Sequence, residues 1–201
     1  MTERIGAIVL AGGRSSRFGR DKLAEPIDGR PLLHHAIAAV QSVAGDVVVV
    51  VAPGQDPALP EGVRLVHDAA AFEGPLAGLA AGLEALDPDI DRVVVVAGDM
   101  PTLEPAVLKR LVAMLGPSVD LALLAVSGEP VPLPMAVRRD MALVAVQGSL
   151  AGGERRLRAL SSVLRTSVIA EATWRLDDPY GDTLRDIDTL ADLAPGTDRR
   201  C

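Results

Sequence analysis

The chain has 201 residues and a formal net charge of -7, and 49% of its residues are hydrophobic while only 2% are aromatic. An acidic chain with so few aromatic rings lacks the basic surface and the stacking platform that nucleic-acid binding uses, so we expect no nucleic-acid partner. The single cysteine, Cys201, excludes a disulfide within the chain, and no apolar run is long enough for a membrane span. Both features favour a cytoplasmic protein with no membrane partner.

Short runs rich in valine, isoleucine and leucine alternate along the chain with stretches that can form helices. Strands are expected at Ile5–Leu10, Val47–Val51, Arg64–Val66, Arg92–Ala97, Leu121–Val126, Met135–Val137 and Ser167–Ile169. Helices are expected at Leu32–Val43, Leu76–Leu86, Pro105–Leu115, Met141–Val146 and Arg155–Leu164. Alternation of this kind predicts a Rossmann-like, three-layer α/β/α fold with a mostly parallel sheet.

The length suits one domain, which we expect to span residues 1–194. The polar residues 195–201 are expected to form a disordered tail. The segment from Gly128 to Pro134 contains three prolines, and this composition predicts a rigid loop and not a linker between domains.

A glycine-rich basic loop follows the first expected strand. It begins with Gly12 and Gly13, and its cationic side chains then occur within nine residues, at Arg14, Arg17, Arg20 and Lys22. Glycines let backbone N–H groups turn toward an anion, and clustered cations on an acidic chain favour a polyphosphate. The glycine spacing matches neither the dinucleotide fingerprint nor the Walker A loop.

A carboxylate, Asp99, comes directly after the buried run Arg92–Ala97. Ligands of open parallel sheets bind beyond the carboxyl ends of the strands, where Asp99 and Gly12 are both expected. Mg²⁺ prefers one or two carboxylates together with phosphate oxygens, so Asp99 is a candidate metal ligand. The alternative is that Asp99 caps the next helix.

Three further groups could serve a nucleotide site. Asp68 follows the third strand and could accept hydrogen bonds from a base or ribose, although it could also be a turn residue. Gly74 and Gly78 would let the next helix approach a nucleotide closely. Arg155 and Arg156 could clamp an acceptor phosphate, or they could be solvated or paired with a neighbouring glutamate.

Near the end of the chain, Asp186 and Asp188 are two residues apart. In an extended segment both carboxylates would point to one side and could join Asp99 at a metal, although Asp188 could instead cap a final helix. The three histidines, His34, His35 and His67, have no zinc-ligand spacing, and packing or surface roles are expected for His34 and His35.

Read together, these segments resemble the molybdenum cofactor guanylyltransferases, within the nucleotidyltransferase superfamily. The likeness rests on Leu10–Lys22, Asp28–Leu32, Asp68, Gly74–Gly78, Asp99–Pro101 and Gly153–Arg156, which occur in the family's order. The resemblance implies a nucleotidyltransferase fold and transfer of GMP from GTP to the terminal phosphate of molybdenum-loaded molybdopterin, with release of pyrophosphate.

The resemblance also assigns roles to individual residues. It implies that the nucleotide is held at Leu10, Ala11, Gly12, Lys22 and Asp68 and that Mg²⁺ is bound by Asp99. The patterns described above add Gly13, Gly74 and Asp99 to the expected nucleotide site. From the residues themselves, catalysis is expected of Arg17, Lys22 and Asp99, Asp188 is a second candidate for Mg²⁺, and Arg155 and Arg156 are the candidates for the acceptor. The resemblance further implies transient contacts with molybdopterin-synthesis proteins and with molybdoenzymes.

The chain departs from the family near its C-terminus, where Asp186 and Asp188 stand in place of two asparagines. Cytidylyltransferases of molybdopterin and guanylyltransferases of phospholactate are therefore alternatives, as are transferases for other phosphorylated acceptors. A module that only binds a nucleotide or cofactor, and a Rossmann-type oxidoreductase, are the alternatives from other functional classes.

Overall fold

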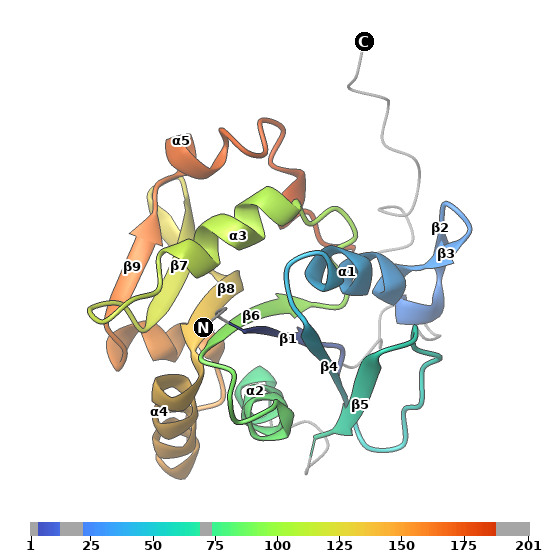
Figure 1. Cartoon of the computed structure of the whole chain (residues 1–201), viewed down its shortest axis with the longest axis horizontal. Helices are drawn as coiled ribbons and strands as arrows, with labels where there is room; N and C mark the ends of the chain where they lie inside the picture. The colour runs from blue at the N-terminus through green and yellow to red at the C-terminus, as the bar shows by residue number, and fades with distance from the viewer. Residues whose placement is uncertain (1–3, 13–21, 69–73, 188–201) are drawn as a thin grey trace.

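The computed structural model describes residues 4–12, 22–68 and 74–187. A seven-stranded sheet with the order β5-β4-β1-β6-β8-β7-β9 forms its centre (Figure 1). The strands are β1 (Ile5–Leu10), β4 (Asp46–Val51), β5 (Val63–His67), β6 (Arg92–Ala97), β7 (Leu121–Val126), β8 (Glu129–Arg138) and β9 (Thr166–Ile169). Only β8 runs antiparallel to its neighbours in this sheet, which confirms the mostly parallel arrangement.

Helices cover both faces of the sheet and complete the three layers (Figure 1). The first face is covered by α1 (Leu32–Gln41) and α3 (Pro105–Ala113), and the second by α2 (Pro75–Ala85) and α4 (Arg139–Ala151). Alternate side chains of each strand enter opposite cores: Val94 and Val96 of β6 face the first, and Val93 and Val95 face the second. Burial on both faces explains why these strands are continuous valine runs.

The α2 helix lies unusually close to β1, because small residues face the strand. A Cβ on Gly82 would lie 2.7 Å from Cγ2 of Ile8, and a Cβ on Gly78 would lie 3.5 Å from Cδ2 of Leu10. This close approach brings the first turn of α2 to the carboxyl end of β1, where the candidate site lies.

The expectation of a loop at Gly128–Pro134 is wrong, because β8 begins at Glu129. Proline cannot donate a ladder hydrogen bond and is tolerated where a strand lacks a partner on one side. The register of β8 with β6 begins only at Met135, whereas its register with β7 extends back to Glu129. Pro130 lies where β8 is paired with β7 alone, and Pro132 and Pro134 lie between Val131 and Met135, where the register of β8 with β7 shifts and neither neighbouring strand pairs with them.

The expectation of a helix over Arg155–Leu164 is also wrong. The structure has only a 3₁₀ helix, η2 (Leu157–Ser162), and Arg156 before it is extended, with φ -99° and ψ 132°. The carboxylate of Glu154 accepts the N–H groups of Arg155 and Arg156 at 2.8 and 2.9 Å, which replaces the bonds of a first helical turn.

Several short elements were not expected from the sequence. They are the 3₁₀ helix η1 (Lys22–Ala24), strands β2 (Pro26–Ile27) and β3 (Arg30–Pro31), helix α5 (Glu171–Trp174) and the 3₁₀ helix η3 (Asp182–Leu184). The β2–β3 hairpin turns at Asp28 and Gly29, with φ values of 49° and 75°. The expected domain end at residue 194 and the tail 195–201 lie outside the described residues. No helix within the described ranges has the length and apolarity to cross a bilayer.

Candidate active site

The ends of β1, β4 and β6 are bonded to one another at the carboxyl edge of the sheet. The N–H of Ala11 donates to the carbonyl of Val50 at 2.8 Å, and the N–H of Gly98 donates to the carbonyl of Leu10 at 2.9 Å. The residues after β1 and β6 thus begin side by side, as expected for the crevice of an open α/β sheet.

Gly12 is packed against the chain that follows β4. A Cβ at this position would lie 3.2 Å from the backbone nitrogen of Ala52 and 3.5 Å from the carbonyl carbon of Val51. Backbone atoms cannot move aside as a flexible side chain can, so this approach favours glycine. The main chain can therefore leave β1 directly along the sheet edge.

Lys22 and Asp99 form an ion pair at this edge. The distance between Nζ of Lys22 and Oδ2 of Asp99 is 2.8 Å, and their side chains are only 14% and 25% exposed. A charge-assisted hydrogen bond in such a partly buried place orients both groups. The sequence placed Lys22 on a phosphate and Asp99 on a metal, and nothing in either motif indicated that they contact each other.

Asp68 lies at the same edge, two strands away from β1. Its N–H donates to the carbonyl of Val51 at 2.9 Å, and its Oδ2 lies 4.0 Å from the position of a Cβ on Gly78. The carboxylate of Asp68 is therefore beside Gly78 in the first turn of α2, which also contacts Leu10 at the end of β1.

The absent side chain of Gly74 makes room for Arg155, a contact that the sequence did not indicate. Its φ is 91°, and a Cβ would lie 2.9 Å from the carbonyl oxygen of Arg155 and 3.0 Å from Cβ of Arg155. The same carbonyl accepts the N–H of Leu76 at 3.3 Å. Two motifs separated by about 80 residues of sequence, Gly74–Gly78 and Gly153–Arg156, are thus in direct contact.

Both arginines of the second basic segment have partners inside the protein. Arg156 binds Glu154 through Nε and Nη2, each at 2.9 Å, while Arg155 donates from Nη1 to the carbonyls of Leu150 and Glu154. The Arg156 guanidinium, followed by the N–H groups of Arg155 and Arg156, lowers the pKa of Glu154 from 4.5 to about 2. Since the side chain of Arg156 is still 62% exposed, its pairing leaves it accessible to solutes.

The C-terminal segment reaches Asp99 through its backbone, which the sequence did not indicate. The N–H of Ile187 donates to the carbonyl of Asp99 at 3.1 Å, and its side chain is fully buried beside Leu32. Asp186 is exposed next to this contact. The apolar residue between two aspartates was the one signal that this segment packs against the fold.

Three residues assigned to the site, Gly13, Arg17 and Asp188, lie outside the described residues. All three histidines bond backbone carbonyls: His34 to Ala58, His35 to Ile27 and His67 to Gln55. In the described part of the chain, no three His, Cys, Asp or Glu side chains are grouped so that they could hold a metal among themselves.

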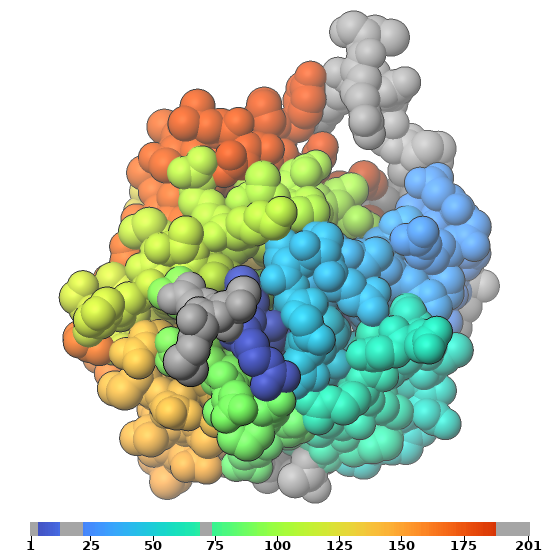
Figure 2. Space-filling view, viewed as in Figure 1, coloured from blue at the N-terminus to red at the C-terminus, as the bar shows by residue number. Residues whose placement is uncertain are grey.

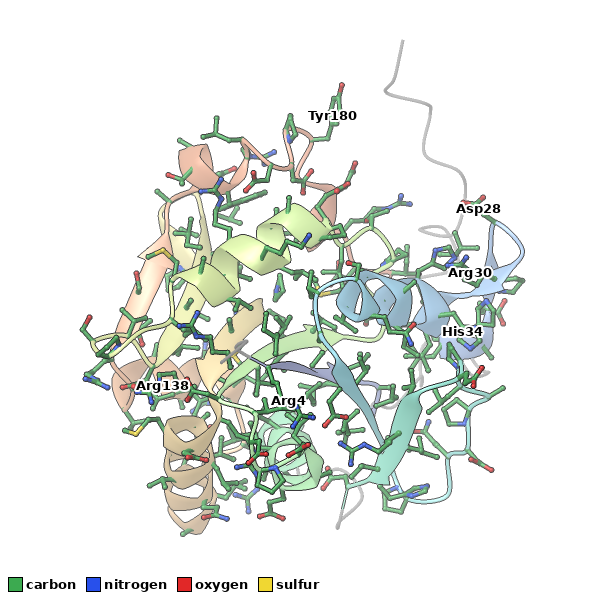
Figure 3. The ribbon with its side chains drawn as sticks, in the orientation of Figure 1. Arg4, Asp28, Arg30, His34, Arg138 and Tyr180 are labelled. Atoms are coloured by element: carbon green, nitrogen blue, oxygen red, sulfur yellow. The ribbon has the colours of Figure 1, made fainter. Side chains whose placement is uncertain are left out.

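A hollow of about 200 Å³ lies at the opposite edge of the sheet, where β1 and β4 begin. Its charged lining residues are Arg4, labelled in Figure 3, and Asp46. Arg4 pairs with Asp87 at 2.8 Å, and Asp46 pairs with Arg64 at 2.7 Å. These ion pairs connect strand ends to neighbouring elements, which is a structural role. The candidate active site is therefore assigned to the carboxyl edge of the sheet.

Comparison with known proteins gives a consistent result. The family model of the MobA-like NTP transferase domain matches residues 7–167. A probable molybdenum cofactor guanylyltransferase of Chloroflexus aggregans is 35% identical over 197 residues, covering 94% of this chain and 91% of that protein. The molybdenum cofactor guanylyltransferase of Xanthomonas euvesicatoria is 39% identical over 161 residues, covering 79% and 78%. The crystal structure of molybdopterin-guanine dinucleotide biosynthesis protein A from Archaeoglobus fulgidus has a TM-score of 0.74 at 21% identity, covering 94% of each chain.

Proposed function

The chain belongs to the family of MobA-like NTP transferases, and from this premise we propose that it transfers GMP from GTP to molybdenum-loaded molybdopterin. Relatives that match over most of their length carry the name molybdenum cofactor guanylyltransferase. The observation that carries the proposal is the pairing of Lys22 with Asp99 at the carboxyl edge of β1 and β6. It gathers a cation and a hard oxygen ligand where the phosphates of a nucleotide would bind.

The proposed nucleotide contacts depend on which backbone N–H and carbonyl groups are already hydrogen-bonded within the sheet. The carbonyl of Leu10 and the N–H of Ala11 are bonded to neighbouring strands, so these two residues are proposed to contact the nucleotide by their surfaces. Main-chain contacts to phosphate are assigned to Gly12 and Gly13. Asp68 is proposed to accept hydrogen bonds from the base or ribose, because a carboxylate suits adjacent N–H donors.

The residues at this edge fit a magnesium ion. Asp99 offers a partly exposed carboxylate, and Mg²⁺ in phosphate chemistry takes one or two carboxylates together with substrate oxygens and water. We propose that Asp99 holds Mg²⁺, with Asp188 as a second candidate ligand. When bound, the ion supplies positive charge for the α- and β-phosphate oxygens.

The chain's own residues then act by positioning and electrostatics. The terminal phosphate of molybdopterin attacks the α-phosphorus of GTP in line, the bond from the α-phosphorus to the bridging oxygen breaks, and pyrophosphate leaves. Lys22 and Arg17 are proposed to stabilise the negative charge that develops on the phosphates. A phosphate with a second pKa of about 6 is already ionised at neutral pH, so no residue is assigned as a general base.

The acceptor is assigned to Arg155 and Arg156. Their segment contacts Gly74 at the start of α2, so it adjoins the helix beside Asp68. An exposed guanidinium can bind the acceptor phosphate while keeping its bond to Glu154, because it carries five N–H donors. The product would then be available to molybdoenzymes, and transient contacts with them are part of the proposal.

The test is pyrophosphate release by the purified protein with Mg²⁺ and molybdenum-loaded molybdopterin, comparing GTP, CTP, ATP and UTP. We expect release with GTP. Release with CTP alone would identify a cytidylyltransferase, a reading favoured by the aspartates at positions 186 and 188. Release only with another phosphorylated acceptor, such as phospholactate, would preserve the reaction type and reject molybdopterin. Tight nucleotide binding without turnover under any of these conditions would indicate a binding module.

A further inference from the structure

Asp178 is one of the few buried polar side chains among the described residues, being only 3% exposed. Its Oδ1 accepts the N–H groups of Gly181 and Asp182 at 2.9 and 3.1 Å, and its Oδ2 accepts the N–H of Thr183 at 2.7 Å. Burying a carboxylate is costly unless it is hydrogen-bonded, and here three backbone donors satisfy it. The carboxylate therefore fixes the backbone of the turn at 178–183.

This turn is attached to the loop that follows Asp99. Thr183 is fully buried, and its Oγ1 accepts the N–H of Glu104 at 3.1 Å. The hydroxyl of Thr102 donates to the carbonyl of Asp182 at 2.7 Å. Together with the bond from Ile187 to the Asp99 carbonyl, three hydrogen bonds join residues 182–187 to residues 99–104.

The residues that precede this turn, Trp174 and Asp177, are also bonded to the rest of the fold. Trp174 is fully buried and its indole N–H donates to the carbonyl of Ala125 at 2.9 Å, while Arg110 of α3 pairs with Asp177. In Figure 2 the orange residues of this region lie against the yellow-green surface of α3. Tyr180 projects outward from the same turn (Figure 3) and is 59% exposed. The turn therefore connects α3 to the loop of residues 99–104 through several hydrogen bonds and an ion pair.

We propose that Asp178 is a positioning residue for Asp99. It acts through the turn: Thr183 holds the main chain at Glu104 and Ile187 holds it at Asp99, so the segment from Asp99 to Glu104 is fixed and with it the position of the Asp99 carboxylate. The inference rests on the proposed function, because it treats Asp99 as the magnesium ligand. Substitution of a group that orients a metal ligand without itself binding the metal typically weakens metal affinity by about 10- to 100-fold.

Two kinds of substitution separate positioning from general stability. Asp178→Asn keeps the shape but replaces an acceptor oxygen with an NH₂ group that faces a backbone N–H. Thr183→Val keeps the shape and removes the acceptor for Glu104, whereas Thr183→Ser keeps that acceptor. Asp140→Asn, on α4 with its side chain 83% exposed, removes the same charge away from the turn and serves as the control.

The experiment titrates the full-length protein with Mn²⁺ alone, without nucleotide, and follows the free ion by electron paramagnetic resonance. We expect Asp178→Asn and Thr183→Val to weaken Mn²⁺ binding by about tenfold, and Thr183→Ser and Asp140→Asn to bind as the wild type does. Melting temperatures ensure that every variant is folded during the titration. Should Asp178→Asn fail to fold, the Thr183 pair decides.

The Asp99→Asn variant separates the proposed metal site at Asp99 from the proposed positioning role of Asp178. If it leaves Mn²⁺ binding unchanged, Asp99 is not the metal ligand, and both the proposed metal site and the inference built on it are rejected. If Asp99→Asn abolishes binding but Asp178→Asn and Thr183→Val bind Mn²⁺ normally and only melt earlier, the proposed metal site stands. The positioning role is then overturned.

Discussion

The ammonium group of Lys22 lies 2.8 Å from a carboxylate oxygen of Asp99, although 77 residues separate them in the sequence. The residue proposed to bind a phosphate and the residue proposed to bind a metal thus contact each other directly. A divalent cation bound to Asp99 would neutralise its carboxylate in place of Lys22. The ammonium group of Lys22 would then be available to bind the phosphates.

This pairing predicts opposite effects for one substitution. Lys22→Gln should lower kcat for pyrophosphate release by at least about 100-fold, the scale of losing one preorganised electrostatic contact. The same variant should bind Mn²⁺ alone more tightly than the wild type, because Asp99 no longer has the ammonium beside it. Turnover assays and Mn²⁺ titration measure the two effects.

The matched control is Lys109→Gln, which makes the same charge change at an exposed position of α3. It should leave both turnover and Mn²⁺ affinity unchanged. Equal effects in the two variants would mean that net charge, and not the contact with Asp99, decides the outcome.

Gly74 is expected to tolerate no side chain. Gly74→Ala should lower the free energy of unfolding by more than about 1 kcal/mol, because φ is 91° and the new Cβ would lie 2.9 Å from the carbonyl oxygen of Arg155. Gly148→Ala in the middle of α4 meets nothing within 4 Å and should raise it by roughly 0.5–1 kcal/mol. Urea unfolding measures both. Equal stability of the two variants would contradict the tight contact.

The turn around Glu154 is expected to respond to acid. Its pKa is lowered from 4.5 to about 2 in the folded state, so its stabilising effect is complete above about pH 4.5 and is lost as pH falls toward 2. The difference in urea midpoint between the wild type and Glu154→Gln should therefore be present at pH 7 and shrink below pH 4.5. A difference that stays constant down to pH 3 would exclude this linkage. Glu129→Gln, at an exposed position, is the control.

The acceptor assignment predicts a selective change in KM. Arg156→Gln should raise KM for molybdenum-loaded molybdopterin by about tenfold and leave KM for GTP unchanged, because one charge-assisted hydrogen bond to the acceptor phosphate is removed. Arg158→Gln, exposed in η2, should change neither value. If Arg156→Gln raises KM for GTP instead, the segment belongs to the nucleotide and not to the acceptor.

Local patterns were sufficient for most of the sheet. The run of valines from Val93 to Val96 is buried on both faces of β6, as its composition indicated. The prolines of β8 locally favour a loop, but the strand accommodates their missing donors: Pro130 is paired with β7 alone, and Pro132 and Pro134 lie where the register with β7 shifts. Whether a proline is tolerated depends on the neighbouring strand, which the local sequence does not contain.

The site shows the same division. Strand periodicity and glycine spacing are local properties, so the sequence was sufficient to place Gly12, Lys22, Asp68 and Asp99 after strands or in loops of a parallel sheet. Three contacts are visible only in the folded chain: Lys22 pairs with Asp99, Gly74 accommodates Arg155, and Ile187 is bonded to Asp99. These contacts join residues some 77 to 88 positions apart, and they form because helices packed on both faces of the sheet leave the strand ends at one shared edge.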